Sequence, residues 1–434
     1  MSYIYPEIRA RFRTALITAR EEIAAIKNPL RVSYPLGTIA EAAAHFAAKE
    51  EFGFTYGRTG TPVGAVLERF ISTLEGGTSA VALASGQAAN YLTFRALLPK
   101  VGDEIVASSR VFGGTASLLR NELPNIGRSA VFADPANSNS FEQAITERTR
   151  ALFVETVSNP DGTVADIERL AEIANKHKIP LVVDNTLAPL LSRPIEWGAH
   201  IVTASLTKFF NGKGDVVGGA VIDSGNFDWK NDSRWPALSA ERPNGVPSLA
   251  KVFNNKAFSA LIRQSLTLYG PSLNPSDAIL IIENARDLAD RIERHSENAY
   301  RVANFLRSHE RVEWVHFLGL DDHPSHEVSH KYLSAPPAVL LFKPKGGVKV
   351  ADYLLQSFNI IRHEANIGYE GTLAIHSFDT THRLFTPEQK QAARIEEGAL
   401  RLSVGIDNPN LLIGELSAAL DHVSSVQSTY EPSF

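Results

Sequence analysis

Short apolar runs alternate with stretches of helical periodicity over much of the chain. Apolar residues recur every three or four positions over 65–75, 87–97 and 167–177, a spacing typical of amphipathic helices. Between and after these stretches lie compact runs rich in β-branched residues, at 80–85, 104–108, 130–134, 151–156, 181–186, 201–205 and 219–223. Several runs are apolar at successive positions, as strands buried on both faces are. The alternation predicts an α/β fold with a mainly parallel central sheet covered by helices.

The same pattern divides the chain into three expected parts. A helical N-terminal arm, 1–55, contains two expected helices at 9–26 and 39–49. A central α/β domain spans 56–250, and a smaller C-terminal α+β domain with its connecting segment spans 251–434. No repeat or low-complexity tract interrupts this organisation.

The second half of the chain is less regular. Residues 224–275 form a polar stretch with several aromatic residues, which we interpret as a long connection. A long amphipathic helix is expected over 275–308. Apolar runs at 312–317, 338–344 and 399–406 then indicate strands of the smaller C-terminal domain.

Composition narrows the possible chemistry. The 434 residues include no cysteine, which excludes disulfides, thiolate nucleophiles and thiolate metal sites. The net charge of −5, from 43 basic and 48 acidic residues, gives no overall field that would favour nucleic acid or an anionic membrane. No apolar run approaches the roughly 20 residues of a membrane span, and the N-terminus lacks a signal-peptide core. We therefore expect a soluble, cytoplasmic protein without nucleic-acid or membrane partners.

Polar residues gather at the ends of the expected strands, where open α/β sheets bind their ligands. Ser85, Gly86 and Gln87 close one strand and open a helix, so their backbone amides could face a phosphate. Ser205 and Thr207 follow another strand and could donate hydroxyl hydrogen bonds to the same group. Each turn alone is weak evidence, because strand ends commonly carry such residues.

Four further strand-end residues suit pyridoxal phosphate. Lys208 supplies an amine that can form a Schiff base, and Asp184 a carboxylate for the pyridinium nitrogen. Asn159 can donate to the phenolic oxygen of the ring, and Phe112 can stack on its face. Asp184 follows an apolar strand, where an ionised carboxylate is costly unless a cation pairs with it. The competing interpretation of Asp184 is an exposed turn residue.

The run SLTKFFNGKGDVVGGAVID (205–223) resembles the lysine signature of the Cys/Met-metabolism pyridoxal-phosphate enzymes. The likeness continues, in the family's order, through YGRTGTP (56–62), LEGGTSAVALASGQAA (74–89), VFGGT (111–115), ETVSNPDG (155–162), VVDNT (182–186), HPSH (323–326), TTH (380–382) and RLSVGID (401–407). It covers nearly all of the chain after residue 50 and is closest to the O-acetylhomoserine sulfhydrylase branch. The resemblance implies the aspartate-aminotransferase-like fold, fold type I.

The resemblance also implies an activity and an assembly. The expected reaction is γ-replacement on O-acetyl-L-homoserine, in which sulfide or methanethiol adds at Cγ by way of a vinylglycine-type intermediate. Lys208 would move the protons, with Asp184 and Phe112 as the other catalytic residues. Tyr56 and Arg58 match residues that reach the cofactor phosphate of a neighbouring subunit, which implies a homotetramer built from dimers that share active sites.

Substrate contacts follow from the same resemblance. Arg401 matches the arginine that binds the substrate α-carboxylate, a role that suits a bidentate guanidinium. Asn159, Tyr56 and Thr372 are the other expected substrate-binding residues.

Several positions depart from the family pattern. Gln87 stands where methionine is common, Phe112 where many relatives have tyrosine, and Lys213 where histidine or a small residue is usual. Residues 366–372 (NIGYEGT) replace the usual N-x-G-D-x-x-S, and 376–378 (HSF) replace His-Pro-Ala. Because 366–378 lines the substrate entrance in relatives, the second substrate stays open.

Three alternatives therefore remain. The first keeps the γ-substitution but uses a carbon nucleophile, an enolate or aldehyde equivalent, as in some secondary-metabolism members of the family. The second is a γ-elimination lyase, which the absent tyrosine hydroxyl at Phe112 disfavours. The third is a non-enzymatic binding protein, which the retention of Lys208, Asp184 and Arg401 together disfavours.

Histidines allow one competing interpretation. His323, His326 and His330 are spaced as metal ligands can be, and so are His376 and His382. With no cysteine, we expect no metal site and interpret these histidines as loop and capping residues. A sequon at 231–233 is expected to be idle, and nucleotide-binding G-x-x-x-x-G-K-[ST] and hydrolase G-x-S-x-G motifs are absent.

Overall fold

Two β-sheets organise the computed structural model, which describes residues 4–46 and 53–426. The larger sheet has seven strands in the order β1-β7-β6-β5-β4-β2-β3. Its strands are β1 (Ser79–Leu83), β2 (Glu104–Ser108), β3 (Ser129–Ala133), β4 (Thr149–Glu155), β5 (Leu181–Asp184), β6 (Ile201–Ser205) and β7 (Gly219–Asp223). The neighbouring pairs among β2 to β6 are parallel, whereas β7 runs antiparallel to both β1 and β6. The mainly parallel sheet is thus confirmed.

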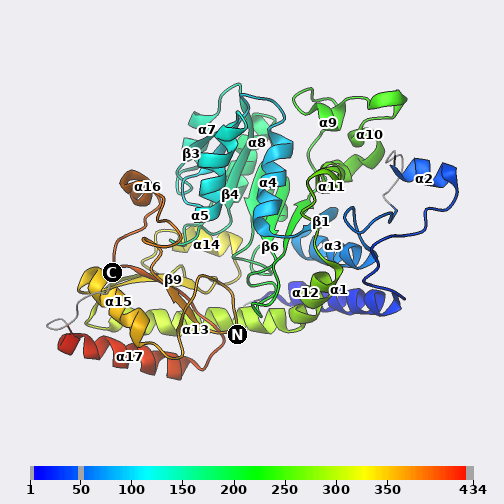
Figure 1. Cartoon of the computed structure of the whole chain (residues 1–434). Coiled ribbons are helices and arrows are strands. Elements are labelled where there is room, and N and C mark those ends of the chain that lie inside the picture. The colour runs from blue at the N-terminus through cyan, green and yellow to red at the C-terminus, as the bar shows by residue number, and fades with distance from the viewer. Residues whose placement is uncertain (1–3, 47–52, 427–434) are drawn as a thin grey trace.

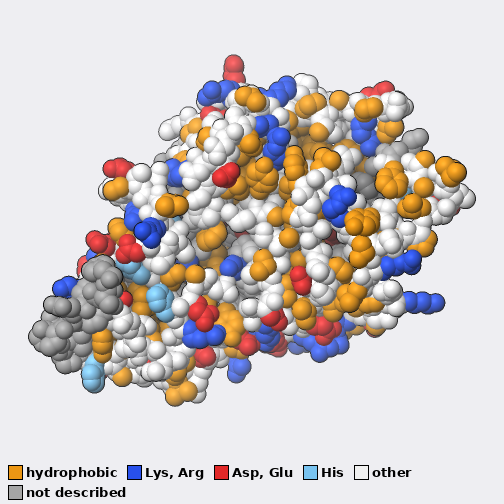
Figure 2. All heavy atoms as spheres, in the orientation of Figure 1, with side chains coloured by type: hydrophobic (Ala, Val, Ile, Leu, Met, Phe, Trp, Pro, Cys, Tyr) orange, Lys and Arg blue, Asp and Glu red, His pale blue; other side chains and the backbone are white. Residues whose placement is uncertain are grey.

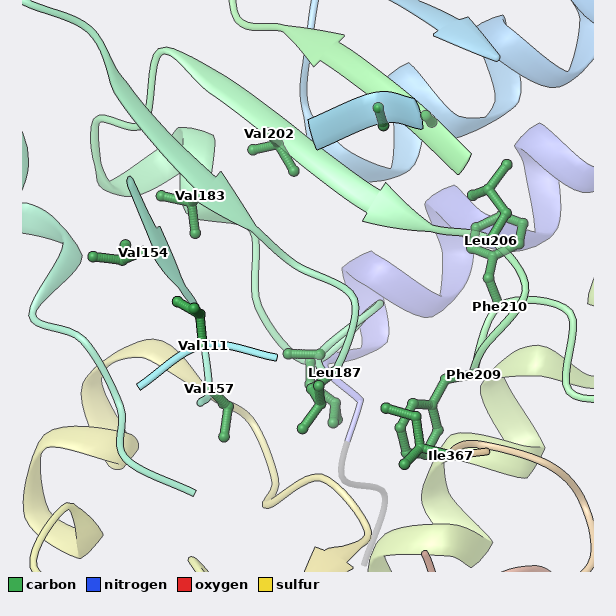
Figure 3. Packing of buried hydrophobic residues seen from close by; sticks show 14 of the residues in the cluster. Val111, Val154, Val157, Val183, Leu187, Val202, Leu206, Phe209, Phe210 and Ile367 are labelled. Carbon is green, nitrogen blue, oxygen red and sulfur yellow. The ribbon is translucent and has the colours of Figure 1, made fainter. Parts of the chain in front are cut away.

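Helices cover both faces of this sheet, and the fully buried Val154, Val183 and Val202 lie side by side on adjacent central strands (Figure 3). Strands that are apolar at successive positions fit this two-sided burial. The helices that accompany the sheet are α3 (Pro62–Glu75), α4 (Gly86–Leu97), α5 (Gly113–Ser117), α6 (Leu123–Asn125), α7 (Ser138–Ala144) and α8 (Ile167–Lys176). A short π-helix over Leu118–Glu122 joins α5 to α6.

The first helix of the N-terminal arm packs on the rest of the chain. The helix α1 (Pro6–Ala25) lies beside α3 and α12 (Pro275–Asn284), as Figure 1 shows. Its Phe12 is buried and contacts Phe70 of α3, with ring centroids 6.1 Å apart. The second expected helix is α2 (Ile39–Phe46), and residues 47–49 lie outside the described residues.

The segment after β7 differs from the long connection that the sequence indicated. It forms α9 (Pro236–Ser239), α10 (Leu249–Phe253) and α11 (Ala257–Tyr269). Trp235 is buried among aromatic rings and donates from Nε1 to the carbonyl of Leu97 at 2.9 Å. The aromatic residues in this polar stretch therefore join the hydrophobic core of the protein, which the low overall hydrophobicity of the stretch concealed.

The single helix expected over 275–308 is also corrected. It is two helices, α12 and α13 (Leu288–Ser308), separated by a 3₁₀ turn over Ala285–Asp287. The long α13 lies below both sheets in Figure 1.

The smaller sheet has five strands in the order β10-β11-β12-β9-β8. These are β8 (Val312–His316), β9 (Val339–Pro344), β10 (Arg362–His363), β11 (Leu373–Ile375) and β12 (Leu400–Ser403). The helices α14 (His326–Tyr332), α15 (Gly347–Ser357), α16 (Pro387–Ala392) and α17 (Pro409–Val426) complete this half. The short strands β10 and β11 gave too little alternation to be predicted, and the domain boundaries near residues 55 and 250 stay predictions.

The surface carries mixed charge. Figure 2 shows basic and acidic side chains scattered among one another over the visible face. Within the described residues, no helix combines the length and the apolar character that a membrane crossing requires.

Candidate active site

A cavity of about 420 Å³ lies at the carboxyl ends of the larger sheet, facing the segment before β11. Ten of the predicted site residues line it: Ser85, Gly86, Gln87, Phe112, Asn159, Asp184, Ser205, Thr207, Lys208 and Arg401. They come from turns that are far apart in sequence. Nine of the ten meet because the strands that they end or follow finish at the same edge of the larger sheet, whereas Arg401 comes from β12 of the smaller sheet.

Lys208 follows β6 and points its amine into this cavity. Lys208 Nζ donates to Asn366 Oδ1 at 2.6 Å. Burial, aided by the nearby positive charge of Arg401, lowers the pKa of Lys208 to about 8. A substantial fraction of the amine is therefore neutral just above neutral pH, which suits a nucleophile or a base that moves protons.

Asp184 stands at the end of β5 with its carboxylate in the cavity. Oδ1 accepts from Thr186 N at 3.0 Å and from Thr186 Oγ1 at 2.6 Å, and Oδ2 accepts from Asn90 Nδ2 at 3.1 Å. Burial raises the pKa of Asp184 above its usual value. No cation of the described residues forms an ion pair with it, so this carboxylate is ready for a cationic partner at the cavity.

The first turn of α4 lies very close to the end of β6 and the beginning of β7. Ser85 caps the helix, its Oγ accepting from Ala88 N at 3.1 Å. A Cβ on Gly86 would lie 2.7 Å from Ser205 Cβ, and one on Gly219 would lie 2.2 Å from the Ser85 carbonyl oxygen. Only glycine permits this approach, which leaves the first amides of α4 facing the cavity beside the hydroxyls that follow β6.

Arg401 reaches the cavity from β12 of the smaller sheet. It is 3% exposed. Nη1 donates to Asn159 Oδ1 at 3.1 Å and Nη2 to the Asn366 carbonyl at 3.2 Å, whereas Nε has no partner in the described part of the chain. Burial lowers the pKa of Arg401 to about 10. A buried guanidinium held by neutral groups attracts an anion such as a carboxylate.

Glu155, at the end of β4, is a cavity residue that sequence reasoning did not assign. Its Oε1 accepts from Phe112 N at 2.7 Å and its Oε2 from Asn159 N at 3.0 Å. Burial and the nearby Asp184 raise the pKa of Glu155 well above its usual value. The Glu155 carboxyl group thus connects the turn that carries the Phe112 ring with the turn that carries the Asn159 side chain. The sequence pattern that could have identified Glu155 is an acidic residue at the end of an apolar run.

Asn90, Thr186 and Asn366 were also missed. Asn90 lies on α4 one helical turn after Gly86, and Thr186 lies two residues after Asp184. Once the ends of the strands are known, helix and strand geometry place both residues near the cavity. Asn366 required the tertiary structure, because it lies in another sheet's loop 158 residues from Lys208.

Three predicted residues lie outside the cavity. Tyr56 is 47% exposed and lies beside the Arg58 guanidinium, which donates to the Thr267 carbonyl. Thr372 is buried, and its hydroxyl donates to Asp407 Oδ2 at 2.7 Å and accepts from Gly405 N at 2.9 Å. Thr372 therefore ties this loop to the segment after β12, and its substrate contact stays a prediction.

The histidines have separate surroundings. His326 and His330 belong to α14, one helical turn apart with their Nε2 atoms at 3.2 Å, so they are not loop residues. His323 contacts the Asp161 carbonyl, and His376 lies 3.0 Å from Asp379. Over residues 4–46 and 53–426, no group of three or more potential ligands is arranged to hold a metal ion.

The cavity fits pyridoxal phosphate on the chemistry of its donors. It offers the Lys208 amine, the partly buried Asp184 carboxylate without a cationic partner in the described chain, an aromatic ring at Phe112, and backbone amides and hydroxyls beside the close approach at Gly86. These match the aldehyde, the ring nitrogen, the ring face and the phosphate of that cofactor.

Comparison with known proteins agrees with this chemistry. The family model of Cys/Met metabolism PLP-dependent enzymes matches residues 16–421. O-acetyl-L-homoserine sulfhydrylase 1 of Thermus thermophilus is 38% identical, covering 88% of this chain and 91% of that protein. The homocysteine synthase of Schizosaccharomyces pombe is 36% identical, covering 86% and 88% of the two chains.

Solved structures give the same result. A putative O-acetylhomoserine (thiol)-lyase from Campylobacter jejuni, which holds N'-pyridoxyl-lysine-5'-monophosphate, superposes with a TM-score of 0.89 at 32% identity, covering 95% of this chain and 99% of that one. Cystathionine gamma synthase from Xanthomonas oryzae pv. oryzae, in complex with aminoacrylate and cysteine, gives 0.81 at 27% identity, covering 95% and 98%. These structures confirm the fold-type-I architecture, and the chain belongs to the Cys/Met metabolism PLP-dependent enzymes.

Proposed function

We propose that the protein catalyses γ-replacement on O-acetyl-L-homoserine, with sulfide or methanethiol as the incoming nucleophile. The observation that carries the proposal is the cavity in which the Lys208 amine, the partly buried Asp184 carboxylate and the buried Arg401 guanidinium meet. Relatives named for O-acetylhomoserine sulfhydrylation, 38% and 35% identical to this chain, support the substrate and the sulfur nucleophile. The product would be homocysteine with sulfide and methionine with methanethiol.

Arg401 would bind and orient the amino-acid substrate. Its Nε, buried without a partner among the described residues, and its Nη groups form a fork that matches a carboxylate. Neutralising this buried charge with the substrate carboxylate would fix the direction of the side chain that carries the acetyl group. Asn159, which already accepts from Arg401, would hold the guanidinium in position.

Lys208 would move the protons. Pyridoxal phosphate, when bound, supplies an electron sink that stabilises negative charge next to the substrate Cα. Lys208 would take a proton from Cα, deliver it to the cofactor, and then take a second proton from Cβ, so that acetate leaves from Cγ. Thiol addition at Cγ is followed by return of the protons to Cβ and Cα. Asp184 would keep the ring nitrogen protonated, and the low amine pKa suits Lys208 to both directions of transfer.

Sulfur must arrive as substrate, because the chain has no cysteine. Phe112 offers a ring face but no acidic hydroxyl, so it would shield the cavity and stack without donating a proton to the leaving group. Acetate, with its low proton affinity, needs no such help. A thiolate leaving group is more basic and would need a proton donor, so the missing hydroxyl disfavours a lyase acting on a thioether and is compatible with replacement of acetate.

We further propose that Ser205, Thr207 and the amides of Gly86 and Gln87 hold the phosphate. Tyr56 and Arg58 would complete the phosphate site of a neighbouring subunit, in a homotetramer. Their position outside this chain's own cavity supports the idea. Native mass spectrometry measures the assembly, and Arg58→Ala should weaken cofactor retention without changing the fold. A monomer with full cofactor retention contradicts this part.

Four parallel incubations of the cofactor-loaded protein with O-acetylhomoserine test the proposal: with sulfide, with methanethiol, with a small ketone, and with no nucleophile. We expect homocysteine and methionine in the first two and little 2-oxobutyrate in the fourth. A ketone adduct formed faster than homocysteine assigns the protein to carbon–carbon bond formation. Rapid 2-oxobutyrate release without nucleophile assigns it to elimination. Lys208→Ala is the control, and it should lose both the yellow colour and every product.

A further inference from the structure

A chain of charged side chains holds the loop that carries Lys208. Arg291 of α13 is buried, and its Nη1 donates to the Phe209 carbonyl at 2.9 Å. Its Nε contacts Asp287 Oδ1 at 2.7 Å, and the other oxygen of Asp287 accepts from Lys213 Nζ at 3.3 Å. The helix therefore fixes the backbone next to Lys208 and reaches Lys213 at the far end of the same loop.

Lys213 also contacts the cavity wall opposite this loop. We call residues 365–370 the wall segment. Glu370 at its end accepts from Lys213 Nζ at 2.6 Å, and Glu370 N donates to the Gly212 carbonyl at 2.9 Å. A Cβ on Gly368 would lie 2.5 Å from Phe209 N. Ile367 and Phe209 lie side by side in Figure 3. The wall segment is therefore seated directly on the Lys208 loop.

The beginning of the wall segment borders the cavity. Ala365, Asn366 and Ile367 line it. Asn366 accepts from Lys208 Nζ through Oδ1, and from Arg401 through its carbonyl. A shift of the wall segment would consequently change both the room in the cavity and the surroundings of the amine.

The Lys213–Glu370 contact joins two segments that are 157 residues apart in sequence. The Lys213 and Glu370 side chains are 30% and 38% exposed, and ion pairs at such exposure contribute little to the stability of the whole protein. We therefore expect the pair to affect the position of the wall segment more than the free energy of unfolding.

We propose that the Lys213–Glu370 ion pair is a specificity-determining contact, which holds the wall segment against the Lys208 loop and sets the room for the second substrate. The two residues do not touch the substrate, and they act by positioning Asn366 and Ile367. The test of nucleophile specificity rests on the proposed function, whereas the test by hydrogen exchange does not.

The structural test is hydrogen exchange of cofactor-loaded protein, read on a peptide that covers the wall segment. Lys213→Met and Glu370→Gln should each speed exchange about two- to fivefold, the factor that corresponds to loss of an exposed ion pair. The double variant should exchange no faster than either single variant. Lys331→Met is the matched control, because it breaks the comparably exposed pair of Lys331 with Glu168 at 2.6 Å, away from the cavity. Unchanged exchange in both single variants overturns the inference.

The specificity test compares methanethiol with sulfide. In the single variants, the kcat/KM ratio of methanethiol to sulfide should rise about two- to fivefold, chiefly through KM of the thiol, because a looser wall admits the larger nucleophile. The double variant should match them, and Lys331→Met should match the wild type. If the wall segment exchanges hydrogen faster in the variants while the methanethiol-to-sulfide ratio stays unchanged, the ion pair has no role in nucleophile specificity. If the wild type turns over neither thiol, the proposed function fails, while the exchange result still decides whether the pair holds the wall segment.

Discussion

The Lys208 amine donates a 2.6 Å hydrogen bond to the side-chain oxygen of Asn366. The two residues come from different halves of the chain, one from the loop after β6 and the other from the loop between β10 and β11. A neutral amide at this distance accepts a hydrogen bond from the amine without stabilising its charge as a carboxylate would. The low pKa of Lys208, about 8, is consistent with such a neutral partner.

Asn366→Asp should therefore raise the pKa of Lys208, because a carboxylate in the same place favours the charged amine. Cofactor addition to the apoprotein requires the neutral amine. Its rate should rise with pH through a midpoint near pH 8 in the wild type, and through a midpoint at higher pH in the variant. Stopped-flow absorbance from pH 6 to 10 measures both curves. Superimposable curves would contradict this account of the pair.

Asp184→Asn should stabilise the apoprotein at neutral pH while removing activity. The folded-state pKa of Asp184 lies above its usual value because of burial, so ionisation costs stability as pH rises above that usual value. Asn90 Oδ1 is buried without a partner in the described chain, and an amide flip would let it accept from the new side chain. Thermal melting of the apoprotein at pH 7, compared with kcat of the loaded protein, measures the two effects. A lower melting temperature would argue against the desolvation cost.

Arg401→Lys should raise KM for the amino-acid substrate about ten- to a hundredfold, the loss expected for a charged bidentate hydrogen bond. The yellow colour should persist, since Lys208 and Asp184 are untouched. Steady-state kinetics with saturating sulfide separates KM from kcat. An unchanged KM would show that the carboxylate binds elsewhere, and thermal melting controls for folding.

Glu75→Gln should flatten the dependence of stability on pH. Burial raises the pKa of Glu75 from 4.5 to about 7, so the folded state favours the protonated acid, and stability is lost as pH rises between these values. This shift corresponds to at most about 3 kcal/mol. Urea unfolding of the apoprotein at pH 5 and pH 8 should show a smaller difference in the variant than in the wild type. Equal differences would exclude Glu75 as the source.

The site was predictable from sequence where its residues stand at strand ends. Lys208, Asp184 and the turn at Gly86 each follow an apolar run, and parallel strands bring such turns to one edge of the sheet. Arg401 was found by its resemblance to a family motif, and no local pattern explains its place.

Contacts between distant segments could not be predicted in this way. The antiparallel direction of β7, the burial of Thr372 against Asp407, and the aromatic core around Trp235 depend on how elements pack against one another. Periodicity shows which face of an element is apolar, but not which other face will cover it.

The sequence by itself determined the strand–helix alternation, the family and the presence of the amine, carboxylate and guanidinium. The physical reason is that these depend on local periodicity and on residue type. Only the tertiary structure decided that Lys208 meets Asn366, that Asn159 holds Arg401, and that Lys213 pairs with Glu370. Such pairs form between segments more than 150 residues apart, and the packing of the two sheets fixes their distances.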